Sequence, residues 1–116
     1  MSDFRNLLVY QKARSLNKDI YKLMRDPSYD RTIRHQLTRA STSIMLNIAE
    51  GGGRFSKKDQ RNFFVIARAS AMECMALFDI IEDLKLMGME ETSNYRNRYI
   101  EISKMLFGMI KRLSST

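Results

Sequence analysis

Apolar residues recur along this chain at alternating spacings of three and four, which is the period of an α-helix with one buried face. Four stretches show the pattern, and nothing in the sequence resembles a strand hairpin. Their apolar positions are Val9, Ala13, Leu16, Ile20 and Leu23; Ile33, Leu37, Ala40, Ile44 and Ile48; Phe63, Ala67, Ser70, Cys74, Leu77, Ile81 and Leu84; and Tyr95, Tyr99, Ile102, Leu106, Met109 and Leu113. The spacing predicts an all-α protein with four amphipathic helices.

Short segments with helix-breaking and helix-capping residues separate the four stretches. The first three helices are expected to end at Pro27, at Gly51 to Gly53 with a left-handed cap, and at Gly88. The second, third and fourth helices are expected to begin at Asp30, at Ser56 with Asp59, and at either Thr92 or Ser93. Helices with such short connections pack as an antiparallel up-down four-helix bundle. The length of 116 residues predicts a single domain over residues 1–116.

The third stretch is expected to form the longest helix, at roughly 30 residues against roughly 20 for the others. It carries a second apolar stripe, formed by Phe64, Ala71, Met75 and Phe78. A helix that is apolar around most of its circumference is buried on more than one side. We expect a four-helix bundle to bury one stripe per helix, so the second stripe is predicted to meet another copy of the chain. The alternative is a wider core within one chain.

The net charge of +7 is concentrated in the first part of the chain. Residues 1–68 contain 14 Lys and Arg against 6 Asp and Glu, whereas residues 69–116 contain 6 against 7. Such asymmetry indicates an acidic partner, with RNA or DNA as the first candidate. The alternative is a basic surface that only keeps the protein in solution.

Two basic groups are candidates for phosphate binding, and each lies near the expected start of a helix, where free backbone amides attract anions. They are Arg54, Lys57, Lys58 and Arg61, and Arg31 and Arg34 with Arg39. The glycine-rich segment lacks the Gly-x4-Gly-Lys-Ser/Thr spacing of nucleotide hydrolases, and a plain pair of helix caps is the alternative. No aromatic residue stands out near these bases, so binding would be to the backbone with little sequence preference.

Glu50 falls in the last turn of the second predicted helix, where the helix dipole disfavours an anion. Either Arg54 or Arg39 is expected to compensate it. Arg39, Asn47 and Glu50, together with Gly51, are predicted to form a structural network that fixes the turn.

Catalysis and metal binding find no support in the sequence. His35 and Cys74 are single residues of their type, too few for a usual zinc site, and no Glu-x-x-His pair is present. We therefore predict that the protein is not an enzyme and that it has no cofactor and no catalytic residue. The lone cysteine, the lack of an apolar run long enough for a membrane and the lack of a signal-peptide pattern at the start predict a cytoplasmic protein.

Several motifs resemble a known family. They are residues 36–44 (QLTRASTSI), residues 47–51 (NIAEG), Gly53-Arg54 and Ser56, with flanking similarity at residues 8–13 and 66–73. The chain is similar over nearly its whole length to the four-helix-bundle family, also called rRNA intervening-sequence proteins after open reading frames inside insertions of bacterial large-subunit rRNA genes. Gly52 departs from the family pattern, in which a bulkier residue is expected.

The resemblance implies an up-down bundle that assembles into ring-like homopentamers. Distant relatives serve as accessory proteins to the reverse transcriptases of diversity-generating retroelements, and use a basic surface to bind nucleic acid and the transcriptase. The resemblance thus implies two alternative roles for this chain, a nucleic-acid-binding oligomer or a scaffold for a protein partner. The Met-rich second stripe of the third helix could serve the scaffold.

Overall fold

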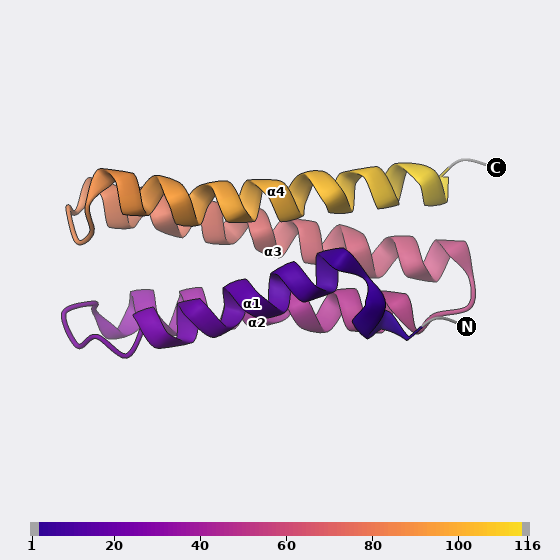
Figure 1. The fold of residues 1–116 in the computed structure, drawn as a ribbon, viewed down its shortest axis with the longest axis horizontal. Coiled ribbons are helices and arrows are strands. Elements are labelled where there is room, and N and C mark those ends of the chain that lie inside the picture. Colours follow the sequence, from indigo (N-terminus) through magenta and orange to yellow (C-terminus); the bar gives the residue numbers. More distant parts are fainter. Residues whose placement is uncertain (1–2, 115–116) are drawn as a thin grey trace.

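The structure is a computed structural model that describes residues 3–114. Its elements are the 3₁₀ helix η1 (Phe4–Asn6) and the α-helices α1 (Leu8–Leu23), α2 (Arg31–Gly52), α3 (Lys57–Asp83) and α4 (Met89–Ser114). The four α-helices alternate in direction along a rod of 47 × 21 × 20 Å (Figure 1). The antiparallel up-down four-helix bundle predicted from the sequence is therefore confirmed.

The two ends of the rod are formed by different connections. The α2–α3 turn, η1 and the last turn of α4 lie at one end, which we call the glycine-turn end (Figure 1). The α1–α2 and α3–α4 connections lie at the other, which we call the Pro27 end. None of the helices within residues 3–114 is long and apolar enough to cross a membrane.

Two of the predicted caps are present. Asp30 Oδ1 accepts a hydrogen bond from the Ile33 backbone N–H at 2.8 Å and so begins α2. Ser56 Oγ accepts one from the Asp59 backbone N–H at 3.1 Å and begins α3. Both satisfy amide groups that a helix start leaves without a partner.

The connection between α3 and α4 differs from the prediction. The helix ends at Asp83, where Lys85 adopts a left-handed φ of 55°, and not at Gly88. Because α4 begins at Met89, Thr92 lies inside it, fully buried, and donates a hydrogen bond to the Gly88 carbonyl at 2.8 Å. The two helices have 27 and 26 residues, so α3 does not overhang the rest of the bundle alone.

The four helices do not share the core equally. α3 packs along both α2 and α4, whereas α1 packs mainly on α2 and comes close to α4 at few places. Two ion pairs cross that looser contact, Lys12 Nζ with Glu101 Oε1 at 3.1 Å and Arg98 Nη1 with Asp19 Oδ2 at 2.9 Å. With neighbours on two sides, α3 can bury two of its faces.

Both apolar stripes of α3 indeed face the interior of this one chain. Phe64, Ala71 and Phe78 are 4%, 0% and 0% exposed, and Phe78 stacks on Tyr95 with 5.3 Å between the ring centroids. The prediction that these three side chains meet another subunit is wrong, because they have no surface left to offer. Met75, the fourth member of that stripe, is partly buried against the same core. The alternative of a wider core within one chain is what the structure shows.

Small polar side chains hold α2 against α3 at mid-height. Ser43 Oγ and Ser70 Oγ are 2.9 Å apart. Asn47 Nδ2 donates to the Ser43 carbonyl at 2.8 Å and to Ser43 Oγ at 3.1 Å. The half-buried Asn47 thus orients the hydroxyl that bridges the two helices, as its expected structural role requires.

Two of the three consecutive glycines, Gly51 and Gly52, lie where a neighbouring side chain approaches the backbone too closely for a Cβ atom. A Cβ on buried Gly51 would lie 2.7 Å from Phe64 Cε1, and one on Gly52 would lie 2.7 Å from Phe4 Cβ. The missing side chains let Phe64 and η1 pack directly on the end of α2. Among the described residues no glycine has a positive φ, so the predicted left-handed cap is wrong. Gly52 serves contact with η1 rather than flexibility.

Replacing Gly51 by alanine should lower the free energy of unfolding by about 1 kcal/mol. Overpacking against the buried Phe64 ring costs about 1–3 kcal/mol, and the better helix propensity of alanine returns about 1 kcal/mol. Gly53→Ala is the matched control, since its Cβ would meet nothing closer than 3.7 Å and its φ of −94° suits alanine. Urea denaturation of both variants measures the difference, and equal stabilities would contradict the close-packing account.

Replacing Asn47 by alanine should lower the free energy of unfolding by about 1 kcal/mol, the usual net value of such hydrogen bonds. Asn94→Ala is the control, because Asn94 is an exposed asparagine within α4 with no hydrogen bond from its side chain in the described structure. Both changes gain the same helix propensity, so the difference between their thermal unfolding curves isolates the bonds to Ser43. If Asn47→Ala is as stable as Asn94→Ala, the bonds contribute nothing.

Candidate functional site

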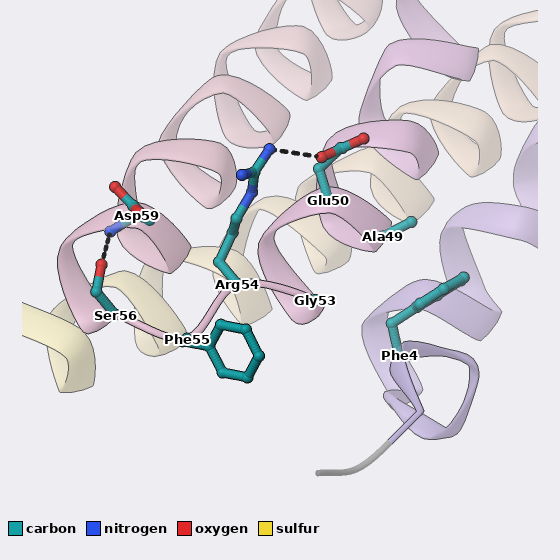
Figure 2. Close-up of a pocket in the computed structure, with 8 residues that line it drawn as sticks. All are labelled: Phe4, Ala49, Glu50, Gly53, Arg54, Phe55, Ser56 and Asp59. Carbon is teal, nitrogen blue, oxygen red and sulfur yellow. Dashed lines mark hydrogen bonds and ion pairs between the residues drawn. The ribbon is translucent and has the colours of Figure 1, made fainter.

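A shallow hollow of about 540 Å³ opens at the glycine-turn end, between η1 and the α2–α3 turn (Figure 2). Its walls are Phe4, Ala49, Glu50, Gly53, Arg54, Phe55, Ser56 and Asp59. The ring of Phe55 is 91% exposed. In Figure 2 Arg54 and Glu50 point toward each other and Ser56 points to the backbone of Asp59, so the polar side chains do not converge on a common point in the hollow.

The polar groups of the turn are paired among themselves. Arg54 Nη2 lies 3.0 Å from Glu50 Oε2, four residues earlier, and the Arg54 guanidinium stacks over the ring of Phe63 at 4.8 Å. Gln60 Nε2 donates to the Arg54 carbonyl at 2.9 Å. The anion at the C-terminal end of α2 therefore has the compensating cation that the sequence led us to expect.

The remaining part of the predicted turn network is not formed. Arg39 contacts Glu73 on α3 and donates to Gln36 Oε1 at 3.0 Å, and it does not reach Glu50. Arg39 and Glu50 are eleven positions apart on α2, about 16 Å along the helix axis, which is too far for one network. Asn47 bonds within α2 to Ser43.

The first predicted basic group does gather at the glycine-turn end, but its members differ in availability. Lys57 and Lys58 are exposed in the first turn of α3 and form no ion pair within residues 3–114. Arg61 Nε donates to Ser114 Oγ at 2.6 Å, which ties α3 to the end of α4. Arg54 is committed to Glu50. Only the two lysines are fully available to a ligand.

The second predicted group lies elsewhere. Arg31 and Arg34 are in the first turn of α2 at the Pro27 end. The 22 residues of α2 separate them from Arg54 by about 33 Å. The two groups are therefore separate sites and cannot hold one phosphate together.

At the Pro27 end the structure shows a basic hollow of about 400 Å³ between the end of α1 and the start of α2. Arg25, Arg31, Arg34 and His35 line it, together with the ring of Tyr21. The expectation that no aromatic residue lies near these bases is therefore wrong. Tyr21 lies in the last turn of α1 and Arg25 in the connection that follows, and residues 24–30 link α1 to the start of α2.

The side chains that could act as a nucleophile or a proton donor, Cys74 and Tyr99, are buried in the core and do not line these hollows. Cys74 is fully buried in the core, and burial raises the pKa of its thiol to about 12. A thiol in this state is not a nucleophile at neutral pH. Buried Tyr99 donates to Ser41 Oγ at 3.0 Å, and burial raises the pKa of its phenol well above the usual value. Over residues 3–114 no group of three His, Cys, Asp or Glu side chains is placed to hold a metal ion.

Comparison with known proteins agrees with the architecture. A crystal structure of a protein with unknown function from the S23 ribosomal protein family of Bacteroides thetaiotaomicron VPI-5482 superposes with a TM-score of 0.84. It is 26% identical and covers 90% of this chain and 96% of its own. No curated protein matches this chain. The family model for the 23S rRNA-intervening sequence protein matches residues 5–108, and the chain therefore belongs to that family.

Proposed function

We propose that this chain is a non-enzymatic helical bundle that assembles with copies of itself and binds RNA or DNA through the phosphate backbone. The observation that carries the proposal is a set of cations at the starts of α2 and α3 that form no ion pair within residues 3–114: Arg31, Arg34, Lys57 and Lys58. Neither its family nor its structural relative points to a catalytic activity.

These positions are unfavourable for cations on their own. The first turn of a helix carries the positive end of the dipole, so each lysine or arginine there costs a few tenths of a kcal/mol. A bound phosphate would offset that cost, because it meets the side chains and the free backbone amides of the same turn. An assembly would repeat both sites several times, and multiplying weak contacts raises avidity without new chemistry.

Support for self-assembly comes from the outer face of α3. With both inner stripes buried, the outward face still carries Val65, Ile66, Met72 and Ile80, each 41–47% exposed. The pairing of Ser43 with Ser70 places Leu46, itself 57% exposed, opposite Ile66 on the adjacent α2. We propose that this surface, the α2–α3 face, contacts other copies. The family resemblance implies five of them.

A second candidate function rests on the same α2–α3 face. If a different protein covers it, the chain is a scaffold or accessory protein, for example to a reverse transcriptase. We place either role in the cytoplasm, because a single buried cysteine fits a reducing compartment.

Assembly is tested by placing a charge on the α2–α3 face. Ile66→Asp should convert the oligomer to a folded monomer, because the interface would bury an unpaired carboxylate. Multi-angle light scattering measures the mass, and circular dichroism checks the helix content. Met89→Asp is the control, since Met89 is 76% exposed at the Pro27 end and lies off this face. A parent protein that is monomeric at micromolar concentration, or an Ile66→Asp variant that stays assembled, would refute self-assembly through this face.

Nucleic-acid binding is tested by salt dependence. The parent should bind RNA or DNA at low salt with little sequence preference, and the logarithm of affinity should fall linearly with the logarithm of salt concentration, at about 0.9 per duplex phosphate contacted. Replacing Lys57, Lys58 and Arg61 by Gln, or Arg31 and Arg34 by Gln, should flatten the slope without changing the oligomer. Lys104→Gln, in an exposed position on α4 away from both ends, is the control. Unchanged slopes in both sets would show that the cations are only a solvated surface.

A further inference from the structure

A second hollow adjoins the basic one at the Pro27 end. It covers about 690 Å³ along the outer face of α1 and is lined by Gln11, Arg14, Ser15, Asn17, Lys18, Tyr21 and Met45. Tyr21 lines both hollows, so the two lie side by side at this residue. Together they form one groove that runs along α1 and reaches the start of α2, which we call the α1–α2 groove.

The charge of this groove is of one sign. Its cations are Arg14, Lys18, Arg25, Arg31 and Arg34, and no Asp or Glu lines either hollow. None of the five forms an ion pair in the described part of the chain. Buried Arg34 Nε also lacks a hydrogen-bond partner there. The site therefore has unused donors and uncompensated charge.

Three carboxylates lie near these cations along the chain, and none of them forms an ion pair with a groove cation within residues 3–114. Asp19 pairs with Arg98 on α4. Asp26 Oδ1 accepts from the Ser28 backbone N–H at 2.9 Å, and Asp30 caps α2. Asp19 is thus used in a contact with α4, and Asp26 and Asp30 hold the backbone of the connection between α1 and α2, so the direct donors of the groove remain open to a ligand.

Tyr21 gives the groove a planar surface. Its side chain is 44% exposed, and its hydroxyl lies 2.9 Å from Thr42 Oγ1 on α2, which fixes the ring between the two hollows. A fixed, exposed aromatic ring flanked by guanidinium and ammonium groups is how proteins bind unpaired bases, with the base stacked on the ring and the phosphates on the cations.

The spacing of the groove residues suits an extended strand. Arg14, Lys18 and Tyr21 follow one another at intervals of four and three, so they lie in a row on one face of α1, and Arg25 follows in the connection after the helix. The helical part of the row is about 10 Å long. A duplex keeps the faces of its bases stacked inside and cannot present one to Tyr21, whereas a single strand can.

We propose that the α1–α2 groove binds a single nucleic-acid strand, with its phosphates on the cations of the groove, from Arg14 on α1 to Arg34 on α2, and one base stacked on Tyr21. The proposal rests on the proposed nucleic-acid function and specifies its site and substrate class. Because every base has a flat face, the stack would accept any base.

Fluorescence anisotropy with a labelled single strand of about 12 nucleotides and with the matched duplex tests the assignment. Tyr21→Leu should weaken single-strand binding by about fivefold or more, the usual effect of removing one stacked base, and leave duplex binding unchanged. Tyr21→Phe keeps the ring and loses only the hydroxyl contact with Thr42, so it should retain most of the single-strand affinity that Tyr21→Leu loses. The double variant Arg14→Gln/Lys18→Gln should flatten the single-strand salt slope by about 0.7 for each phosphate that is no longer neutralised. Circular dichroism verifies that each variant is folded.

The outcomes separate this site from the broader function. If Tyr21→Leu and Arg14→Gln/Lys18→Gln bind the single strand like the parent while Lys57→Gln/Lys58→Gln does not, the groove assignment is overturned and nucleic-acid binding stands at the glycine-turn end. If the parent binds neither probe at low salt, both proposals are overturned. If Tyr21→Phe weakens binding as much as Tyr21→Leu, the ring is not a stacking platform and the assignment also fails.

Discussion

The position of α3 between α2 and α4 is the constraint on which the rest of the bundle depends. It buries two stripes at once, so Ala67, Cys74 and Ile81 face the core together with Phe64 and Phe78. Burial on this scale, at about 25 cal/mol per Å² of apolar surface, is the main favourable term in folding. It also requires close approach at the turn, which only a residue without a side chain at the end of α2 permits. The third face of α3 remains apolar and exposed.

The charge distribution follows from the same packing. Four acidic residues of α3 and α4 are used in contacts between helices: Glu73 with Arg39, Asp79 and Glu82 with Arg96, and Glu101 with Lys12. These pairs compensate three cations and use four of the carboxylates in the second half of the chain. In the part of the chain that the structure describes, Arg14 and Lys18 on the outer side of α1 and the bases at the starts of α2 and α3 have no such counterpart. The uneven charge seen along the sequence thus becomes a surface with two separate basic regions in space.

Sequence periodicity is sufficient to predict the four helices and most of the core residues, because a 3.6-residue period directly defines a buried face. The N-caps Asp30 and Ser56 and the Glu50–Arg54 ion pair can also be predicted from the sequence, since caps and i,i+4 pairs involve residues close together in the chain. Periodicity does not define how many neighbours a helix has, and for that reason it wrongly assigns the second stripe of α3 to another subunit. Tyr21 and Arg31 are ten positions apart across a turn, and no local rule brings them into one groove.

The weak contact between α1 and α4 has a consequence for the dynamics of the bundle. The two ion pairs that cross it are about half exposed, and such pairs contribute at most about 1 kcal/mol each. A helix of 16 residues is marginal by itself, so α1 depends on α2 and on the short segment η1. Its amide protons should therefore exchange with solvent through a local opening that leaves α3 and α4 intact, and faster at high ionic strength. A ligand lying across α1 and α2 would join the least stable helix to a stable one and slow that exchange.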